Sequence, residues 1–159
     1  HDDAEWADRA RQFSAQVKDL TEWLTQTNPP IAYRLLPIAH PVTYHDACHL
    51  AHAQRVTKPP RDLVRAVAGS KFVELPESDV CCGSAGSYNL TEPEMAERLQ
   101  RRKIGNILKT GAHTVVTTNP GCILQIQAGL KKAGASHVRV QHIADFLSEA
   151  TRATDRKIP

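Results

Sequence analysis

The chain has 159 residues, of which 41% are hydrophobic, and this composition fits one globular domain with an apolar core and excludes a disordered polymer. Twenty lysine and arginine residues against 17 aspartate and glutamate residues give a formal net charge of +3. Because no aromatic–basic motif accompanies this mild excess, we expect no nucleic-acid partner. No run of about 18 apolar residues occurs, so we also expect no transmembrane segment.

Residues 1–30 predict one long N-terminal helix. Apolar side chains recur along a single face at alternating steps of four and three residues: Trp6, Ala10, Phe13, Val17, Leu20 and Leu24. The run Asn28-Pro29-Pro30 is expected to end this helix. We favour packing of the apolar face on the core of the domain. The alternative is docking on another part of the protein, since the chain opens at His1 inside a helical pattern and is expected to be a fragment of a longer polypeptide.

Residues 41–150 alternate between strand and helix patterns. We expect strands at residues 42–44, 71–75, 114–118 and 137–140, and helices at residues 61–68, 91–110, 121–133 and 143–150. Thr91 and Glu94 predict a capping box at the start of the second of these helices. The alternation indicates an α/β domain, a Rossmann-like parallel sheet of about four strands flanked by helices. The polar tail at residues 151–159 is expected to fray.

Four cysteines lie just beyond the predicted strands. Cys48 follows the first strand, and Cys122 follows the third. The adjacent Cys81 and Cys82 follow the second. The carboxyl ends of parallel strands share the edge where open α/β sheets bind ligands, so these thiols are expected to converge. Since the sequence shows no export signal, clustered cysteines indicate a metal or redox site rather than a disulfide framework.

The residues alone leave three interpretations of this site open. A structural zinc ion usually takes its thiolates from close Cys-x2-Cys pairs, which are absent here. A 4Fe–4S-type cluster accepts thiolates from several loops, and unligated buried cysteines are the third interpretation. His45 and His49 flank Cys48 in the sequence; we interpret them as donors that support the ligands, with direct ligation as the alternative.

Longer strings around the cysteines resemble a known family. The segment Cys81-Cys82-Gly83, with Cys48 upstream and Cys122 downstream, resembles the cysteine-rich CCG domain of heterodisulfide reductase and its relatives. Four segments look most like the C-terminal domain of the glycolate oxidase iron–sulfur subunit, namely residues 44–52, 74–78, 82–90 and 119–122. The resemblance is close over residues 40–145, and one position departs from it. In heterodisulfide reductase the pattern ends in Cys-x-x-Cys, whereas the first position of that pair is Asn119 here.

The resemblance implies an iron–sulfur electron-transfer domain without a complete active site of its own. A 4Fe–4S-type cluster would be held by Cys48, Cys81, Cys82 and Cys122, and the missing fifth cysteine puts the non-cubane cluster of heterodisulfide reductase in doubt. FAD is expected only in partner subunits, the flavin-containing subunits that oxidise glycolate to glyoxylate. The expected location is cytoplasmic, at the inner face of a bacterial inner membrane, where electrons pass to a membrane acceptor. The alternative is a zinc-binding or metal-free docking module of a 2-hydroxy-acid dehydrogenase complex.

Overall fold

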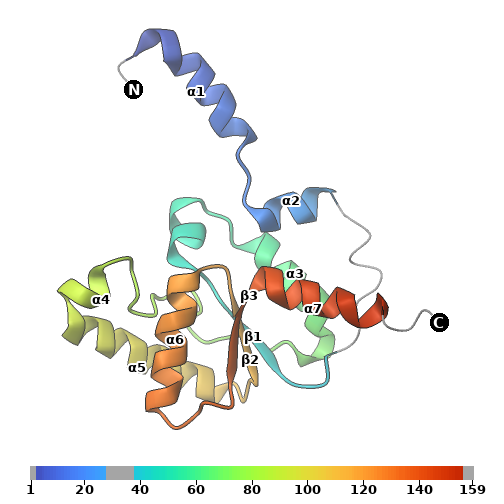
Figure 1. Cartoon of the computed structure of the whole chain (residues 1–159), viewed down its shortest axis with the longest axis vertical. Helices are drawn as coiled ribbons and strands as arrows, with labels where there is room; N and C mark the ends of the chain where they lie inside the picture. Colours follow the sequence, from blue (N-terminus) through green and yellow to red (C-terminus); the bar gives the residue numbers. More distant parts are fainter. Residues whose placement is uncertain (1–2, 28–37, 156–159) are drawn as a thin grey trace.

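A computed structural model describes residues 3–27 and 38–155, and at its centre lies a parallel sheet of three strands (Figure 1). Strands β1 (Val42–His45), β2 (Thr114–Thr117) and β3 (Arg139–His142) lie side by side in that order. Their register pairs the last residue of β2 with the last residues of both neighbours, so the three strands end at one edge. Every residue of β1 and β2 is buried, as expected for a parallel sheet that is covered on both faces.

Two pairs of helices cover the faces of the sheet. Helices α3 (Lys58–Ala68) and α7 (Ile143–Asp155) pack on the face formed by Val42, Tyr44 and Val116. Helices α5 (Pro93–Lys109) and α6 (Pro120–Lys132) pack on the opposite face, against Val115 and Val140. The described part of the chain is therefore a three-layer α/β domain, and the α/β class predicted from the alternating pattern is confirmed.

The fourth strand predicted at residues 71–75 is not found in the described part of the chain. Residues Gly69–Lys71 form a short 3-10 helix, η3, and Phe72 makes only an isolated bridge to Val42. One further backbone hydrogen bond, from the N–H of Val73 to the carbonyl of Val42, measures 2.8 Å. Pro76 follows within a few residues and lacks an N–H to extend the pairing. The sheet thus has three strands, and the Rossmann-like arrangement stays a prediction.

The helices after β1 differ from the predictions mainly at their ends. The π-helix η2 (His49–Ala53) occupies what the sequence suggested to be a loop. A separate short helix, α4 (Tyr88–Thr91), precedes α5, whose N-cap is Glu92 without a side-chain cap hydrogen bond. The predicted capping box of Thr91 and Glu94 is therefore wrong. Helix α7 continues to Asp155, so residues 151–155 do not fray as expected, while residues 156–159 lie outside the described part.

The N-terminal segment forms two helices instead of one. Helix α1 (Ala4–Gln16) ends at Val17, and α2 (Leu20–Thr27) begins three residues later. A capping box separates them: the Asp19 side chain accepts from the N–H of Thr21 at 2.8 Å, and the Glu22 side chain accepts from the N–H of Asp19 at 3.1 Å. The expected stop at residues 28–30 lies outside the described residues.

The apolar face of this segment is mostly in contact with solvent. Leu24 packs against the cluster between α3 and α7, as the core-packing interpretation predicts. That interpretation is wrong for the side chains that stay exposed, which are Trp6, Phe13, Val17 and Leu20. Helix α1 stands away from the layers around the sheet in Figure 1. Docking of this face on another part of the protein stays a prediction.

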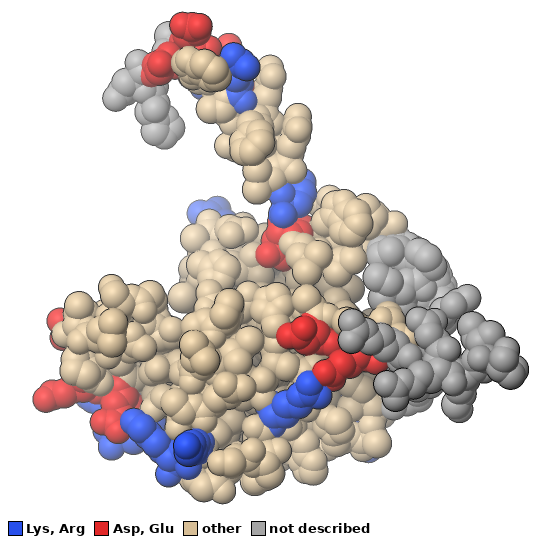
Figure 2. Space-filling model, in the orientation of Figure 1, with Lys and Arg blue, Asp and Glu red and all other residues tan. Residues whose placement is uncertain are grey.

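Charged side chains of both signs lie next to one another on the face shown in Figure 2. Arg139 of β3 pairs with Glu149 of α7, and Lys132 of α6 pairs with Glu97 of α5 at 3.6 Å. None of the helices within residues 3–27 and 38–155 combines the length with the apolar character that crossing a bilayer requires.

The close packing of α5 on α6 depends on a glycine. A Cβ on Gly129 of α6 would lie 2.7 Å from Cγ1 of Ile104 and 2.8 Å from Cγ of Gln100, whereas a Cβ on Gly105 of α5 would meet nothing within 4 Å. We expect Gly105→Ala to raise the free energy of unfolding by about 0.5–1 kcal/mol through helix propensity. Gly129→Ala should lower it by about 1 kcal/mol, because overpacking outweighs the same gain in propensity. Urea denaturation followed by circular dichroism measures both changes, and equal stabilisation by the two variants would contradict this packing.

Candidate metal centre

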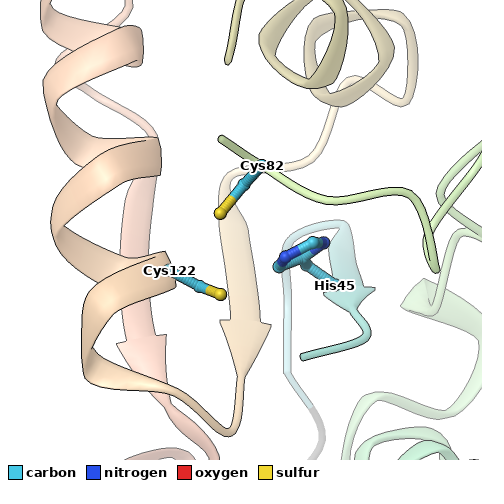
Figure 3. A group of neighbouring side chains, drawn as sticks. All are labelled: His45, Cys82 and Cys122. Carbon is cyan, nitrogen blue, oxygen red and sulfur yellow. The ribbon is translucent and has the colours of Figure 1, made fainter. Parts of the chain in front are cut away.

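Three buried side chains from separate segments converge beyond the carboxyl edge of the sheet. His45 is the last residue of β1, Cys82 lies in the loop before α4, and Cys122 lies in the first turn of α6. Taking one donor atom from each residue, these atoms all lie within 4.8 Å of one another. Figure 3 shows the imidazole ring and the two sulfur atoms pointing toward the same space. The exposed fraction of each residue is 5% or less, so water is largely excluded from the group.

The imidazole of His45 is held in one tautomer by the backbone. Its Nδ1 lies 3.0 Å from the carbonyl oxygen of Ser78, which can only accept, so Nδ1 carries the proton. Burial, and after it the positive charge of Lys103, lowers the pKa of His45 to about 3. The ring is therefore neutral at physiological pH, and its Nε2 carries a free lone pair. This Nε2 is buried and has no hydrogen-bond partner.

The cysteine thiols are crowded and resist ionisation on their own. The hydrogen bond with the Cys122 thiol, followed by burial, raises the pKa of Cys82 to about 11. Its hydrogen bond with Cys82, followed by burial, raises the pKa of Cys81 far above the ordinary range of a thiol. Neighbouring thiolates in a buried space repel one another, whereas a bound cation reverses this balance and deprotonates its thiol ligands. The donor set of two thiols and one neutral imidazole fits a thiophilic metal.

The loop that carries the adjacent cysteines wraps its backbone around their sulfur atoms. Gly83, Ala85 and Gly86 have positive φ angles of 92°, 36° and 65°. The N–H of Gly83 donates to Sγ of Cys81 at 3.3 Å. N–H groups turned inward by such a conformation are suited to stabilise thiolates or cluster sulfurs. Ala85 adopts this conformation despite its side chain, which indicates a tightly constrained loop.

The start of α6 brings Cys122 to the same place. The side chain of Asn119 caps this helix by accepting from the N–H of Cys122 at 3.2 Å. Pro120 occupies the first turn, where its missing N–H costs nothing. A Cβ on Gly121 would lie 2.9 Å from Oγ of Ser84, so glycine allows the cysteine loop to approach the helix. Cys122 thus lies at the positive end of the helix dipole, which favours a thiolate.

A buried lysine anchors the segment before the cysteine loop. Lys103 of α5 has an exposed fraction of 2%, and its ammonium group donates to the carbonyls of Glu77 and Ser78. Burial lowers the pKa of Lys103, while the nearby Cys82 and Asp79 raise it. Its positive charge therefore stands close to the thiols and favours any anionic group that they hold.

The structure brings together part of the predicted site. Cys82 and Cys122 converge as predicted, and Cys81 contacts the Cys82 thiol from a half-buried position. Cys48, at the start of η2, is half-buried and lies outside the group of three. Ligation by all four cysteines therefore stays a prediction.

The two histidines that flank Cys48 in the sequence have different positions. His49 is exposed, whereas His45 belongs to the group of three. The sequence alone suggested a supporting role for His45, although a signal for more was present. Side chains alternate along a strand, so a histidine that ends β1 lies on the same face as Thr117, at the edge next to Cys122.

A comparison with known protein families decides the assignment. A sequence profile described as the cysteine-rich domain CCG matches residues 42–127, a span that contains all four cysteines. The chain belongs to this family. The CCG domain is 39% identical over 150 residues, 94% of the chain, to the probable glycolate oxidase iron–sulfur subunit of Bacillus subtilis, and covers 34% of that protein.

Other relatives of the CCG domain carry related names. It is 37% identical over 134 residues to one subunit of the CoM/CoB fumarate reductase of Methanothermobacter marburgensis, covering 84% of the chain and 27% of that subunit. It is 29% identical over 149 residues to lactate utilization protein A of Bacillus subtilis, covering 92% of the chain and 61% of that protein. The chain thus spans between about a quarter and three fifths of the length of these relatives.

The cysteine loop offers a test with a matched control. Gly83 and Gly86 both have positive φ, yet a Cβ on Gly83 would lie 2.3 Å from the carbonyl oxygen of Ala96, while a Cβ on Gly86 would meet nothing within 4 Å. We expect Gly86→Ala to cost about 1 kcal/mol of stability through backbone strain alone. Gly83→Ala should cost more than about 2 kcal/mol and should also reduce metal uptake, because the loop must move away from α5. Thermal unfolding and metal analysis measure both effects. Equal losses in the two variants would contradict the described loop.

Proposed function

We propose that this CCG domain holds an iron–sulfur cluster of the 4Fe–4S type and serves as an electron-transfer domain of a glycolate oxidase complex. The observation that carries the proposal is the convergence of Cys82 and Cys122 with His45, buried at the carboxyl edge of the sheet. The names of the relatives support it, because the iron–sulfur subunit of a glycolate oxidase is among them. A cluster bound in this place supplies one-electron chemistry.

The chain's own residues would bind this cluster and set its surroundings. Cys82 and Cys122 are the first ligands, with Cys81 and Cys48 proposed to complete the thiolate set. The positive-φ turn from Gly83 to Gly86 directs N–H groups toward the sulfur atoms. Burial of the group limits access of water, and the charge of Lys103 favours an anionic occupant.

The substrate, partners and location belong to the proposed complex. We propose that flavin-containing subunits, which hold the FAD, oxidise glycolate to glyoxylate and deliver electrons to this domain. The relative named lactate utilization protein A makes another 2-hydroxy acid the next candidate substrate. The proposed location is cytoplasmic, with peripheral attachment through the complex to the inner face of the bacterial inner membrane, where the acceptor lies.

One observation favours a second function, that of a structural zinc module which docks partner subunits. Two thiolates on one tetrahedral zinc ion lie about 3.8 Å apart, given Zn–S bonds of about 2.3 Å. The limit of 4.8 Å between the donors of His45, Cys82 and Cys122 suits a single ion of this kind. Such an ion would stabilise the fold without redox activity.

Anaerobic reconstitution with iron and sulfide separates these two functions. We expect about four irons per chain and a broad visible absorption that dithionite bleaches. Cys82→Ala should lose the iron and the colour, because it removes a central ligand. Ser87→Ala should keep both, because its side chain is exposed in the same loop and makes no cap hydrogen bond. An iron-free chain that retains one zinc ion under these conditions would sink the electron-transfer function and favour the zinc module.

The buried lysine gives a prediction about the reduction potential. Lys103→Met removes a positive charge beside the thiols, so reduction, which adds a negative charge, becomes less favourable and the potential falls. Lys109→Met removes an exposed charge from the last turn of the same helix and should leave the potential nearly unchanged. Redox titration followed by EPR compares the two variants. A potential that is unaffected in Lys103→Met would show that this cation does not act on the centre.

A further inference from the structure

The imidazole of His45 ends at a nitrogen with no assigned role. Its Nε2 is buried, lacks a hydrogen-bond partner and belongs to the same group of donor atoms as the sulfurs of Cys82 and Cys122. We propose that His45 is itself a metal ligand, whose Nε2 binds the metal centre alongside those two thiolates. This inference rests on the proposed function in one respect only, that the group holds a metal.

The backbone prepares His45 for this role. The Ser78 carbonyl fixes the proton on Nδ1, so the lone pair must reside on Nε2. Metal-binding histidines typically donate the other ring N–H to a carbonyl or carboxylate, which fixes the tautomer and the ring orientation. The same Ser78 carbonyl accepts from the ammonium of Lys103 at 3.3 Å and from the N–H of Asp46 at 3.1 Å, so it is held in place from two further sides.

Other polar groups near the site are already engaged elsewhere. Asp46 pairs with Arg61 at 2.6 Å. The ring of His52 contacts the carbonyl of Asp79 at 3.0 Å in an exposed position. Asn119, which stands where the five-cysteine pattern has a thiolate, uses its side-chain oxygen to cap α6. Among the described residues, His45 is the nitrogen donor that joins the buried cysteines, and a buried acceptor without a partner is rare unless it has a function.

A histidine ligand changes what the centre can do. An imidazole is neutral, whereas the thiolate it replaces is an anion, so the centre carries one negative charge fewer. In Rieske-type centres the same exchange raises the reduction potential. We therefore expect the potential of this centre to lie above that of the all-thiolate variant His45→Cys.

Pulsed EPR on protein with ¹⁵N in its histidine rings tests the inference. The chain is reconstituted anaerobically, reduced, and compared with the variants His45→Cys and His49→Asn. We expect a strong ¹⁵N hyperfine coupling in the parent chain, its loss together with a lower potential in His45→Cys, and its retention in His49→Asn, because His49 is exposed. A reducible cluster without strong ¹⁵N coupling overturns the inference and leaves the proposed function standing.

Titration of the metal-free chain with Co²⁺ covers the case in which no cluster assembles. In that case the electron-transfer function fails, and the role of His45 is judged separately. A visible Co²⁺–thiolate spectrum whose affinity falls at least tenfold in His45→Gln, but not in His49→Asn, supports ligation by His45. Equal affinities and identical spectra in the parent chain and His45→Gln, or no Co²⁺ binding at all, overturn the inference.

Discussion

The carbonyl oxygen of Ser78 is the point on which the metal centre depends. It accepts hydrogen bonds from Nδ1 of His45, from the backbone N–H of Asp46 and from the ammonium of Lys103. These donors belong to the end of β1, to the residue after it and to α5, so one oxygen joins the sheet, a covering helix and the loop before the cysteines. Loss of this contact would release both the orientation of the imidazole and the position of the loop.

The electrostatics of the centre follow from the same arrangement. Burial excludes water and makes ionisation of the adjacent thiols unfavourable, as the raised pKa values of Cys81 and Cys82 indicate. Lys103 and the start of α6 supply positive charge close to the sulfurs, but neither replaces a bound cation. The group is thus an assembly of donors whose charges are balanced only when it holds a metal, and this is why metal binding and local folding should be coupled.

Sequence patterns predicted the elements whose signals are local. The β-branched run at residues 114–118 indicated β2, and Pro120 marked the start of α6. The missing fourth strand shows the limit, because residues 71–75 have strand-like side chains but make only one bridge to the sheet. The break between α1 and α2 had a local signal that was overlooked, the Asp19–Glu22 capping box within a continuous apolar pattern.

The candidate site was predictable only in outline. The order of strands and cysteines was enough to expect convergence of Cys82 and Cys122 at one edge. The part of His45 depends on the carbonyl of Ser78, 33 positions along the chain, and no spacing rule reveals such a contact. Whether Cys48 joins the centre likewise depends on how η2 is placed, which the sequence pattern does not specify.

A crystal structure of the anaerobically reconstituted chain, with diffraction data collected on both sides of the iron absorption edge, tests the central claim most directly. The account predicts anomalous density for iron among His45, Cys82 and Cys122, with Nε2 of His45 at bonding distance. Iron held elsewhere, or free thiols at Cys82 and Cys122 in a chain that contains iron, would contradict it.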